Sequence, residues 1–254
     1  MEAFAFPVER KKVYLQDGTY VGKEALIRPD TGKIFSVVGE DYQFLPHEEA
    51  IQKTEEVLHT LGDCQRSGLS ITHDGARIRV SYDFIDKRVT VKSTRGVTDD
   101  VAPRLIMTNS YDGQMKFGFI LGAYQFICSN GLRIGYDIFD INRKHTSGLD
   151  LGVILDKASS AFSHFMNQTY PRYVQMGQVP VPNATEYLEH MKEEKQAPAR
   201  LIDVIMKQVA DKAVSECTEW DIYSEFTNFL THTYKKSDDR RDELNKIVAK
   251  SFGL

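Results

Sequence analysis

The sequence predicts a soluble α+β protein, with a twisted antiparallel sheet backed by helices and a helical C-terminal subdomain. Apolar and polar residues alternate with period two between residues 69 and 120, which is typical of strands with one buried face. From about Leu149 onward the apolar residues recur at helical spacing instead. The composition, 41% hydrophobic and 27% charged, is that of a globular chain. The proline-containing segment 177–183 predicts a boundary between a main domain, residues 1–176, and a subdomain, residues 184–254.

The first 62 residues are expected to form short extended segments and one helix. Turn-forming pairs such as Asp17-Gly18 and Thr31-Gly32 separate the extended pieces. The β-branched and aromatic segment 33–38 predicts a strand. After Pro46, apolar residues near helical spacing predict a helix that Gly62 ends.

The middle of the chain is predicted to form several strands of a sheet, whose solvent-exposed face carries positively charged side chains. In the segment 77–82, the apolar side chains Ile78, Val80 and Tyr82 alternate with Arg77, Arg79 and Ser81. The segments expected to be strands are 69–72, 77–82, 88–92, 104–108 and 116–120, with a hairpin turn at Asp74-Gly75. The polar face of two of these strands would carry Arg77, Arg79, Arg88 and Lys92.

Helices are expected in the last hundred residues. An apolar face over 149–166 predicts a helix that Pro171 closes. Further helices are expected at about 184–195, capped by Asn183, 198–215, started by Pro198, 219–234 and 238–250. The face that begins with Trp220 and Tyr223 is expected to pack in the interior or against another subunit.

The charge distribution, the cysteines and the lack of long apolar runs predict a cytoplasmic protein that does not span a membrane and whose middle segment is positively charged. The net charge is −4, but residues 63–183 carry 14 Lys and Arg against 11 Asp and Glu, a local excess of three positive charges. Three separated cysteines, Cys64, Cys128 and Cys217, indicate reduced thiols and a cytoplasmic location. No apolar run reaches about 18 residues, so no membrane span is expected, and the first residues lack a secretory signal pattern.

Several motifs of enzymes are missing from the sequence. The seven histidines show no HxH or HExxH spacing, and no glycine-rich phosphate loop occurs. We therefore predict no cofactor and no metal, and a role without catalysis is favoured over an enzyme.

Two motifs in the middle of the chain admit a structural and a functional interpretation. Asn109-Ser-Tyr-Asp-Gly113 is rich in turn formers. It would close a hairpin, or it would present Asn109, Ser110 and Asp112 as polar groups with Tyr111 as a stacking face. Cys128-Ser-Asn-Gly131 predicts a strand-to-turn junction, because Asn130 and Gly131 readily adopt the left-handed backbone of a turn. A nucleophilic Cys128 would need a base, which no histidine adjacent in sequence supplies and which only folding could bring close.

These two motifs, in the order N-S-Y-D-G and then C-S-N-G-L, resemble the phage and plasmid-like family known as domain of unknown function 932. The segment Phe35-Ser-Val-Val38 looks like the opening of that family, and Trp220–Thr227 with Ser251-Phe-Gly253 looks like its C-terminal signature. The resemblance spans about residues 33–253. It implies a role in the life cycle of a mobile genetic element and brings no established reaction.

The leading functional hypothesis is a non-enzymatic protein of phage or plasmid DNA metabolism that binds single-stranded nucleic acid and promotes annealing or recombination as a homo-oligomer. Arg77, Arg79, Arg88 and Lys92 would neutralise phosphates, with Tyr111 and Arg133 at the edge of that surface. DNA and RNA are both open. The alternative is an anti-defence protein that blocks a host enzyme or sequesters its signal, and a third possibility is a metal-dependent hydrolase using Asp112, Asn109 and a histidine.

Overall fold

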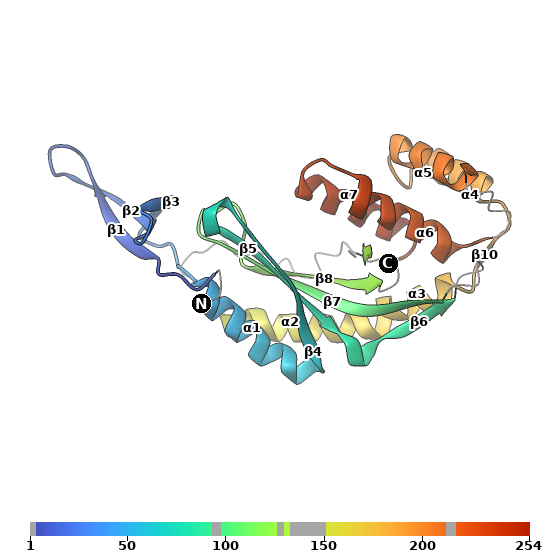
Figure 1. Ribbon diagram of the computed structural model, residues 1–254, viewed down its shortest axis with the longest axis horizontal. Coiled ribbons are helices and arrows are strands. Elements are labelled where there is room, and N and C mark those ends of the chain that lie inside the picture. Colours follow the sequence, from blue (N-terminus) through green and yellow to red (C-terminus); the bar gives the residue numbers. More distant parts are fainter. Residues whose placement is uncertain (1–3, 93–97, 126–129, 133–150, 212–216) are drawn as a thin grey trace. The chain divides into compact units, whose positions relative to one another are not determined.

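In the computed structural model, residues 4–92, 98–125, 130–132, 151–211 and 217–254 are described (Figure 1). They form helices and antiparallel sheets, which confirms the predicted α+β class. By contacts between residues the chain forms two compact units. The first contains Met1–Tyr82, Ile106–Phe119 and Phe139–Ser160, and the second contains Asp83–Leu105, Ile120–Ile138 and Ala161–Leu254. The boundary expected within 177–183 stays a prediction.

The elements follow the sequence pattern closely. The strands are β1 (Glu9–Tyr14), β2 (Tyr20–Arg28), β3 (Lys33–Gly39), β4 (Cys64–Thr72), β5 (Arg77–Phe84), β6 (Val89–Lys92), β7 (Thr98–Ser110), β8 (Gly118–Gln125), β9 (Asn130–Leu132), β10 (Pro180–Val181) and β11 (Cys217–Thr218). The helices are α1 (His47–Leu61), α2 (Leu151–His164), α3 (Tyr170–Met176), α4 (Ala184–Glu193), α5 (Ala199–Asp211), α6 (Glu219–Asn228) and α7 (Asp238–Ser251).

Within the described residues, the strands form three sheets. β1, β2 and β3 pair antiparallel in that order. A larger sheet has the order β4-β5-β7-β8-β9, and β6 pairs with β7. β10 and β11 form a short antiparallel pair, so the expected linker 177–183 contains a strand. β5 and β6 both pair with β7 and not with each other in the strand order. Along the chain, the short helical turn Ile85–Lys87 joins them.

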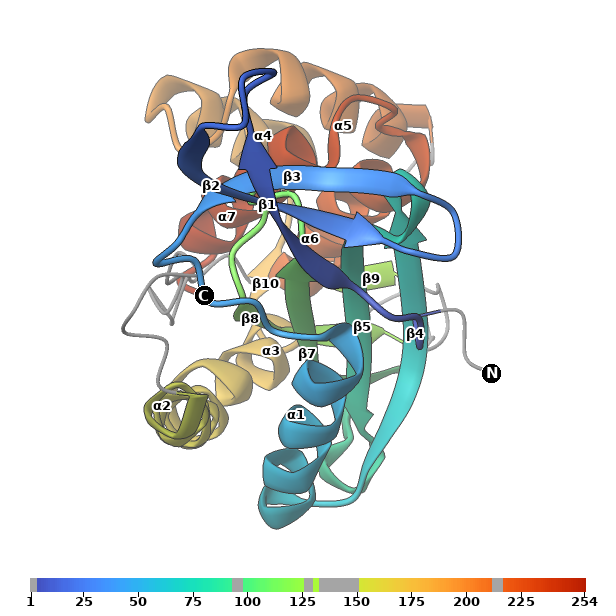
Figure 2. The same ribbon diagram turned by 90° about the vertical axis from the view of Figure 1, so that its left-hand side faces the viewer.

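In the first unit, an aromatic core joins the small sheet to the helix α1. Buried Leu26, Val38 and Tyr111 form a cluster. The partly buried side chains packed on this cluster are Phe6, Val8, Phe35, Tyr42 and Phe44. α1 runs along β4 and β5 (Figures 1 and 2) and ends at Gly62, as predicted.

The C-terminal helices match the prediction where the structure describes them, except at Pro171; residues 149–150 and 212–215 of the expected helices lie outside the described residues. α2 does not stop before this proline, because a π-helical turn, Phe165–Thr169, links it to α3, and Pro171 lies in the first turn of α3, where no backbone donor is needed. Asn183 caps α4 by accepting from the backbone N–H groups of Thr185 and Glu186, as expected. Trp220 is fully buried, and its Nε1 donates to Oδ2 of Asp99 at 2.8 Å, which confirms its packing role.

Candidate nucleic-acid interface

The N-S-Y-D-G motif lies at the end of β7, and its first three residues are buried. The Oγ of Ser110 donates to the carbonyl of Met115 at 2.6 Å and accepts from the Met115 N–H at 3.1 Å, so the motif closes a turn towards β8. Asn109 is fully buried and Tyr111 is only 1% exposed. This burial corrects the expectation that Asn109 and Ser110 are presented to a ligand and that Tyr111 offers an exposed ring to a base.

The buried end of the motif fixes the start of α1. Nδ2 of Asn109 donates to the carbonyl of Leu45 and to Nδ1 of His47, both at 3.0 Å. Nε2 of His47 therefore carries the proton and donates to the carbonyl of Gly75 at 2.9 Å. The hydroxyl of Tyr111 accepts from the His47 backbone N–H at 2.7 Å, the two rings stack at 3.7 Å, and burial raises the pKa of Tyr111. These contacts assign the motif a structural role.

The fourth residue of the motif neutralises one of the predicted cations. Nε of Arg77 donates to Oδ2 of Asp112 at 2.5 Å, while Oδ1 of Asp112 accepts from the backbone of Gln114. Arg77 and Arg79 are half-buried on the face of β5 opposite to Ile78, which confirms the predicted alternation. The charge that Arg77 would offer to a phosphate is thus already paired.

The other two predicted cations, Arg88 and Lys92, belong to the second unit. Arg88 directly precedes β6, and Lys92 is the last residue of β6. Nη1 of Arg88 is 3.5 Å from Oδ2 of Asp100, whose Oδ1 accepts from Oγ1 of Thr90 at 2.8 Å. Lys92 is exposed, and no carboxylate of the described residues lies within ion-pair distance of it. The outward face of β6 is therefore polar, as predicted, with Lys92 as its open positive charge.

The structure brings the predicted site residues together in pairs. Arg77 and Arg79 share β5, whereas Arg88 and Lys92 belong to the other compact unit. Arg133 and Cys128 lie outside the described residues. The backbone of Asn130 is in β9, and its side chain is not among those described. A single surface formed by all of these cations stays a prediction.

A second basic surface, which the sequence patterns did not reveal, lies on the small sheet β1–β3 (residues 9–39), here termed the β-arm (Figure 1). Tyr14 and Tyr20 face each other across the β1–β2 hairpin with ring centroids 5.6 Å apart, and Tyr14 is 55% exposed. Nζ of Lys12 lies 5.3 Å from the centre of the Tyr20 ring. Lys12 and Lys23 are exposed, and neither has a described carboxylate within ion-pair distance. The basic run before Tyr14 was the available sequence signal.

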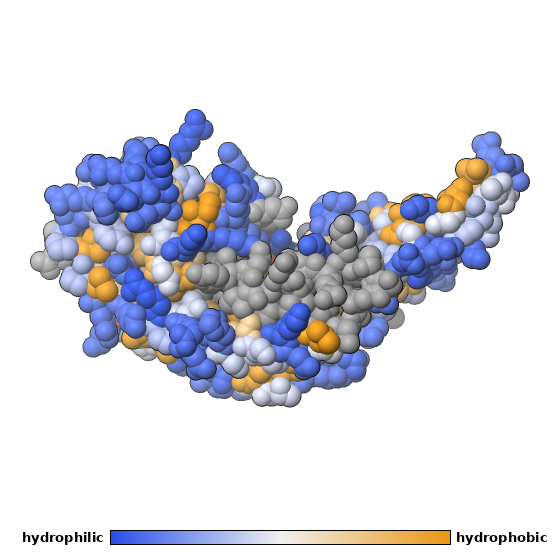
Figure 3. Space-filling view, turned by 180° about the vertical axis from the view of Figure 1, so that it is seen from behind, coloured by the Kyte–Doolittle hydropathy of each residue, from blue (hydrophilic) through white to orange (hydrophobic). Residues whose placement is uncertain are grey.

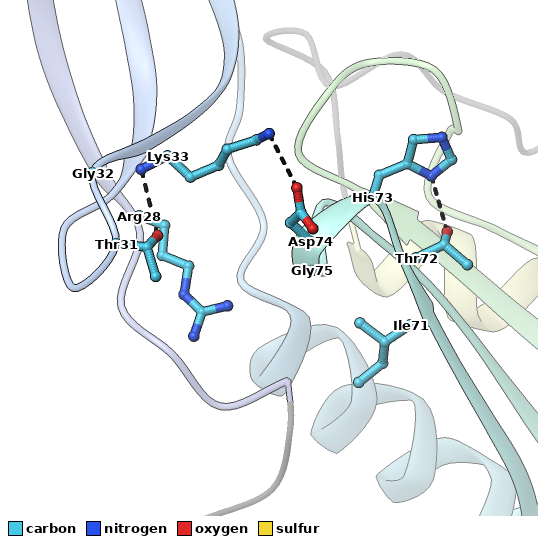
Figure 4. A pocket seen from close by; sticks show the side chains of 9 residues that line it. All are labelled: Arg28, Thr31, Gly32, Lys33, Ile71, Thr72, His73, Asp74 and Gly75. Carbon is cyan, nitrogen blue, oxygen red and sulfur yellow. Dashed lines mark hydrogen bonds and ion pairs between the residues drawn. The ribbon is translucent and has the colours of Figure 1, made fainter.

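An open pocket of about 880 Å³ lies in the same unit, between the β2–β3 turn and the β4–β5 turn (Figure 4). Its lining residues are Arg28, Thr31, Gly32, Lys33, Ile71, Thr72, His73, Asp74 and Gly75. Arg28 binds Asp30 through Nε at 2.9 Å and Nη2 at 3.0 Å, and its guanidinium lies 4.0 Å from the centre of the Phe6 ring. Lys33 reaches across to Asp74 at 3.0 Å.

The turn that closes this pocket is held in an unusual backbone conformation. His73 and Asp74 have φ values of 55° and 58°, in the left-handed region that side chains other than glycine enter at a cost. Gly75, at φ 98°, has the ring of Phe6 so close that a Cβ would lie 2.6 Å from it. The pocket offers guanidinium, ammonium and hydroxyl donors, although Asp30 and Asp74 occupy the two cations.

The comparisons with known proteins give a family. The model of the family described as Domain of unknown function (DUF932) matches residues 34–249, most of the chain. The chain belongs to the DUF932 family. No curated protein and no solved structure matches it. The match begins inside β3, so the tyrosine pair and lysines of the β-arm precede the part of the chain that the DUF932 model covers.

Metal-binding clusters and membrane-spanning helices are both missing from the described part of this DUF932 chain. Among the described residues, no group of three or more His, Cys, Asp or Glu side chains is arranged to hold a metal ion. None of the described helices is long and apolar enough to cross a membrane.

Proposed function

We propose that this DUF932 protein binds single-stranded nucleic acid, and that the β-arm is its main contact surface. The observation that carries the proposal is the exposed ring of Tyr14, paired with the partly buried Tyr20 and with Lys12 beside it. Proteins that bind single strands combine aromatic faces, on which bases stack, with cations that follow the phosphates. The β-arm supplies both, and Lys23, on the opposite face of β2 from Glu24 and Lys12, adds a second exposed ammonium group.

Local charge supports the same surface. Residues 9–39 contain six Lys and Arg against four Asp and Glu, so the β-arm is positive although the whole chain carries a net charge of −4. The pocket cations Arg28 and Lys33 belong to the same unit and would meet the sugar-phosphate backbone once their carboxylates turn aside. Arg79 and Lys92, expected from the sequence to bind phosphates, are proposed as further contacts.

The biological setting is part of the proposal. The resemblance to phage and plasmid-like proteins motivates a non-enzymatic role in the DNA metabolism of a mobile element, including annealing and recombination, in the cytoplasm of the host. Stacking on tyrosine rings tolerates any base, so the interface favours binding without sequence preference. RNA would bind by the same contacts unless the 2′-hydroxyl is excluded.

The proposal is tested by fluorescence anisotropy with a labelled oligothymidine of about 30 nucleotides, over a salt range of roughly 50 to 300 mM. The wild-type affinity should fall steeply with salt, because each neutralised phosphate releases counterions. Tyr14→Ala should remove a stacking contact of about 1–3 kcal/mol. The double substitution Lys12→Gln, Lys23→Gln should lower the slope of log affinity against log salt by about 0.7 for each lysine that contacts a phosphate.

Lys207→Gln is the matched control, because Lys207 is an exposed lysine of α5 with no described carboxylate within ion-pair distance. It should leave both affinity and slope unchanged. Wild-type binding that is weak and independent of salt would reject the proposal. If a pull-down from host lysate then recovered one stoichiometric protein without nucleic acid, the interaction-protein alternative would take its place.

A further inference from the structure

The two edges of the β-arm differ in how they are protected against pairing with another strand. β1, at one edge, has four consecutive charged residues, Glu9 to Lys12. β3, at the other edge, has no charged residue between Lys33 and Glu40. Charged side chains, above all lysines, are a common means by which proteins keep a sheet edge from joining a second sheet. Of the two edges, β1 has this protection and β3 lacks it.

The unprotected edge also exposes apolar surface. Ile34 is 54% and Val37 55% exposed, although both lie in a strand whose other face packs on the aromatic core through Val38. Ser36 is held inward by donating from Oγ to the carbonyl of Tyr111 at 2.6 Å. Hydrophobic surface is visible along the β-arm in Figure 3 between hydrophilic residues. An apolar sheet edge of this kind is a site for adding another strand.

We propose that β3 pairs antiparallel with β3 of a second copy of this chain. The segment is self-complementary in charge, because its apolar residues 34–39 are flanked by Lys33 at one end and Glu40 at the other. With the two-fold axis at Val37 and Phe35 bulged, as it is against β2, Lys33 of each copy lies opposite Glu40 of its partner. A strand with equal charges at both ends would lack this match.

The present contacts of the two charged residues leave them able to pair in this way. Lys33 is bound to Asp74 in an exposed ion pair, and such pairs contribute little stability. Glu40 is exposed and accepts from the Tyr20 hydroxyl through Oε1 at 2.6 Å. Both groups can therefore reach a partner strand without exposing a buried charge.

The same edges explain why assembly would stop at two copies. Pairing of β3 with β3 yields a continuous six-stranded sheet whose outer strands are the two copies of β1. Since β1 carries the charged run, this sheet ends in protected edges and does not extend into a filament. A two-strand contact is small, so the dimer is expected to dissociate in the micromolar range.

The test is sedimentation velocity of the full chain over a range from about 1 to about 100 µM. The wild type should shift from monomer to dimer, and Val37→Lys should raise the dimer dissociation constant at least about tenfold, because it places a charge on the open edge. Val204→Lys, which puts a lysine at another exposed valine, in α5, is the control and should dimerise like the wild type. Circular dichroism of each variant establishes that it is folded.

A cysteine at position 37 gives a second readout that does not depend on affinity. In Val37→Cys the two introduced thiols lie on adjacent strands near the axis, so a short bismaleimide should trap a covalent dimer. The wild type and Val204→Cys should give none. A wild type that remains monomeric at about 100 µM, or a dimer that Val37→Lys leaves intact, overturns the proposal. Neither substitution alters Lys12, Tyr14 or Lys23, so oligonucleotide binding can succeed or fail independently.

Discussion

Asn109 is a residue whose surroundings, more than its type, decide what it does. Its sequence context is that of an exposed turn, yet the side chain is fully buried and oriented by two acceptors. Both hydrogens of Nδ2 are used, on the carbonyl of Leu45 and on Nδ1 of His47. An amide is suited to this position because it supplies two donors without a charge.

We therefore expect Asn109→Asp to be strongly destabilising. The substitution places a carboxylate oxygen against two acceptors and buries a charge, so the free energy of unfolding should fall by about 3 kcal/mol or more. Urea denaturation measures it. The same change at exposed Asn167 should stay within about 0.5 kcal/mol of the wild type. A tolerated Asn109→Asp would mean that the buried network does not hold α1 in place.

The candidate site could be predicted from sequence only in part, and the reason appears at single residues. Alternation along β5 correctly predicted the outward Arg77, but its partner Asp112 is 35 residues away, so no local pattern shows that the charge is neutralised. The ring of Tyr111 was predicted to be exposed but is buried, because Phe6, Phe35 and Phe44 pack against it from distant segments. Periodicity predicts the direction in which a side chain points, but it does not predict which residues from distant segments contact that side chain.

At the scale of elements, local signals predicted most of the fold. Pro46 and Gly62 bound α1, and Asn183 caps α4 as expected, because caps and breakers act within a few residues. The π-helical turn before Pro171 was missed, since it depends on packing rather than on residue type. The pairing of β6 with β7 could not be predicted from the sequence, because strand order is set by non-local contacts.

The contact between α3 and β6 gives a prediction at the scale of elements. A Cβ at Gly177, just after α3, would lie 2.6 Å from the carbonyl oxygen of Lys92 and 2.9 Å from Cγ1 of Val91. The helix end and the strand must therefore move apart in Gly177→Ala, which should cost about 1–3 kcal/mol in the free energy of unfolding. Thermal and urea unfolding measure this cost.

Gly39→Ala provides the matched comparison for that substitution. A Cβ added at Gly39 would meet no atom within 4 Å, and the backbone there does not require the left-handed conformation. Alanine should therefore be neutral or slightly stabilising at this position. Equal effects at both glycines would show that loss of backbone freedom, not the close approach to β6, governs Gly177.

At the scale of the whole molecule, buried tyrosines are distributed over both compact units. Burial raises the pKa of Tyr42 to about 12, and burial together with Glu219 raises that of Tyr187 to about 12. Others have a pKa raised further, chiefly by burial, and these are Tyr82, Tyr111, Tyr170, Tyr173 and Tyr223. The hydroxyls of the folded chain thus keep their protons to higher pH than those of the unfolded chain.

Stability should consequently be lost on the alkaline side. Below a pH of about 10, the ordinary tyrosine pKa, both states are protonated and the tyrosines do not affect folding. Above it the unfolded chain loses protons while the folded chain keeps them, so each buried tyrosine lowers the free energy of unfolding by about 1.4 kcal/mol per pH unit until its folded pKa is reached. With such groups in both units, we expect cooperative unfolding between about pH 10 and about pH 12. Tyrosinate absorbance and circular dichroism should change together in this range. A gradual rise in absorbance with unchanged circular dichroism would instead show that these hydroxyls are open to solvent.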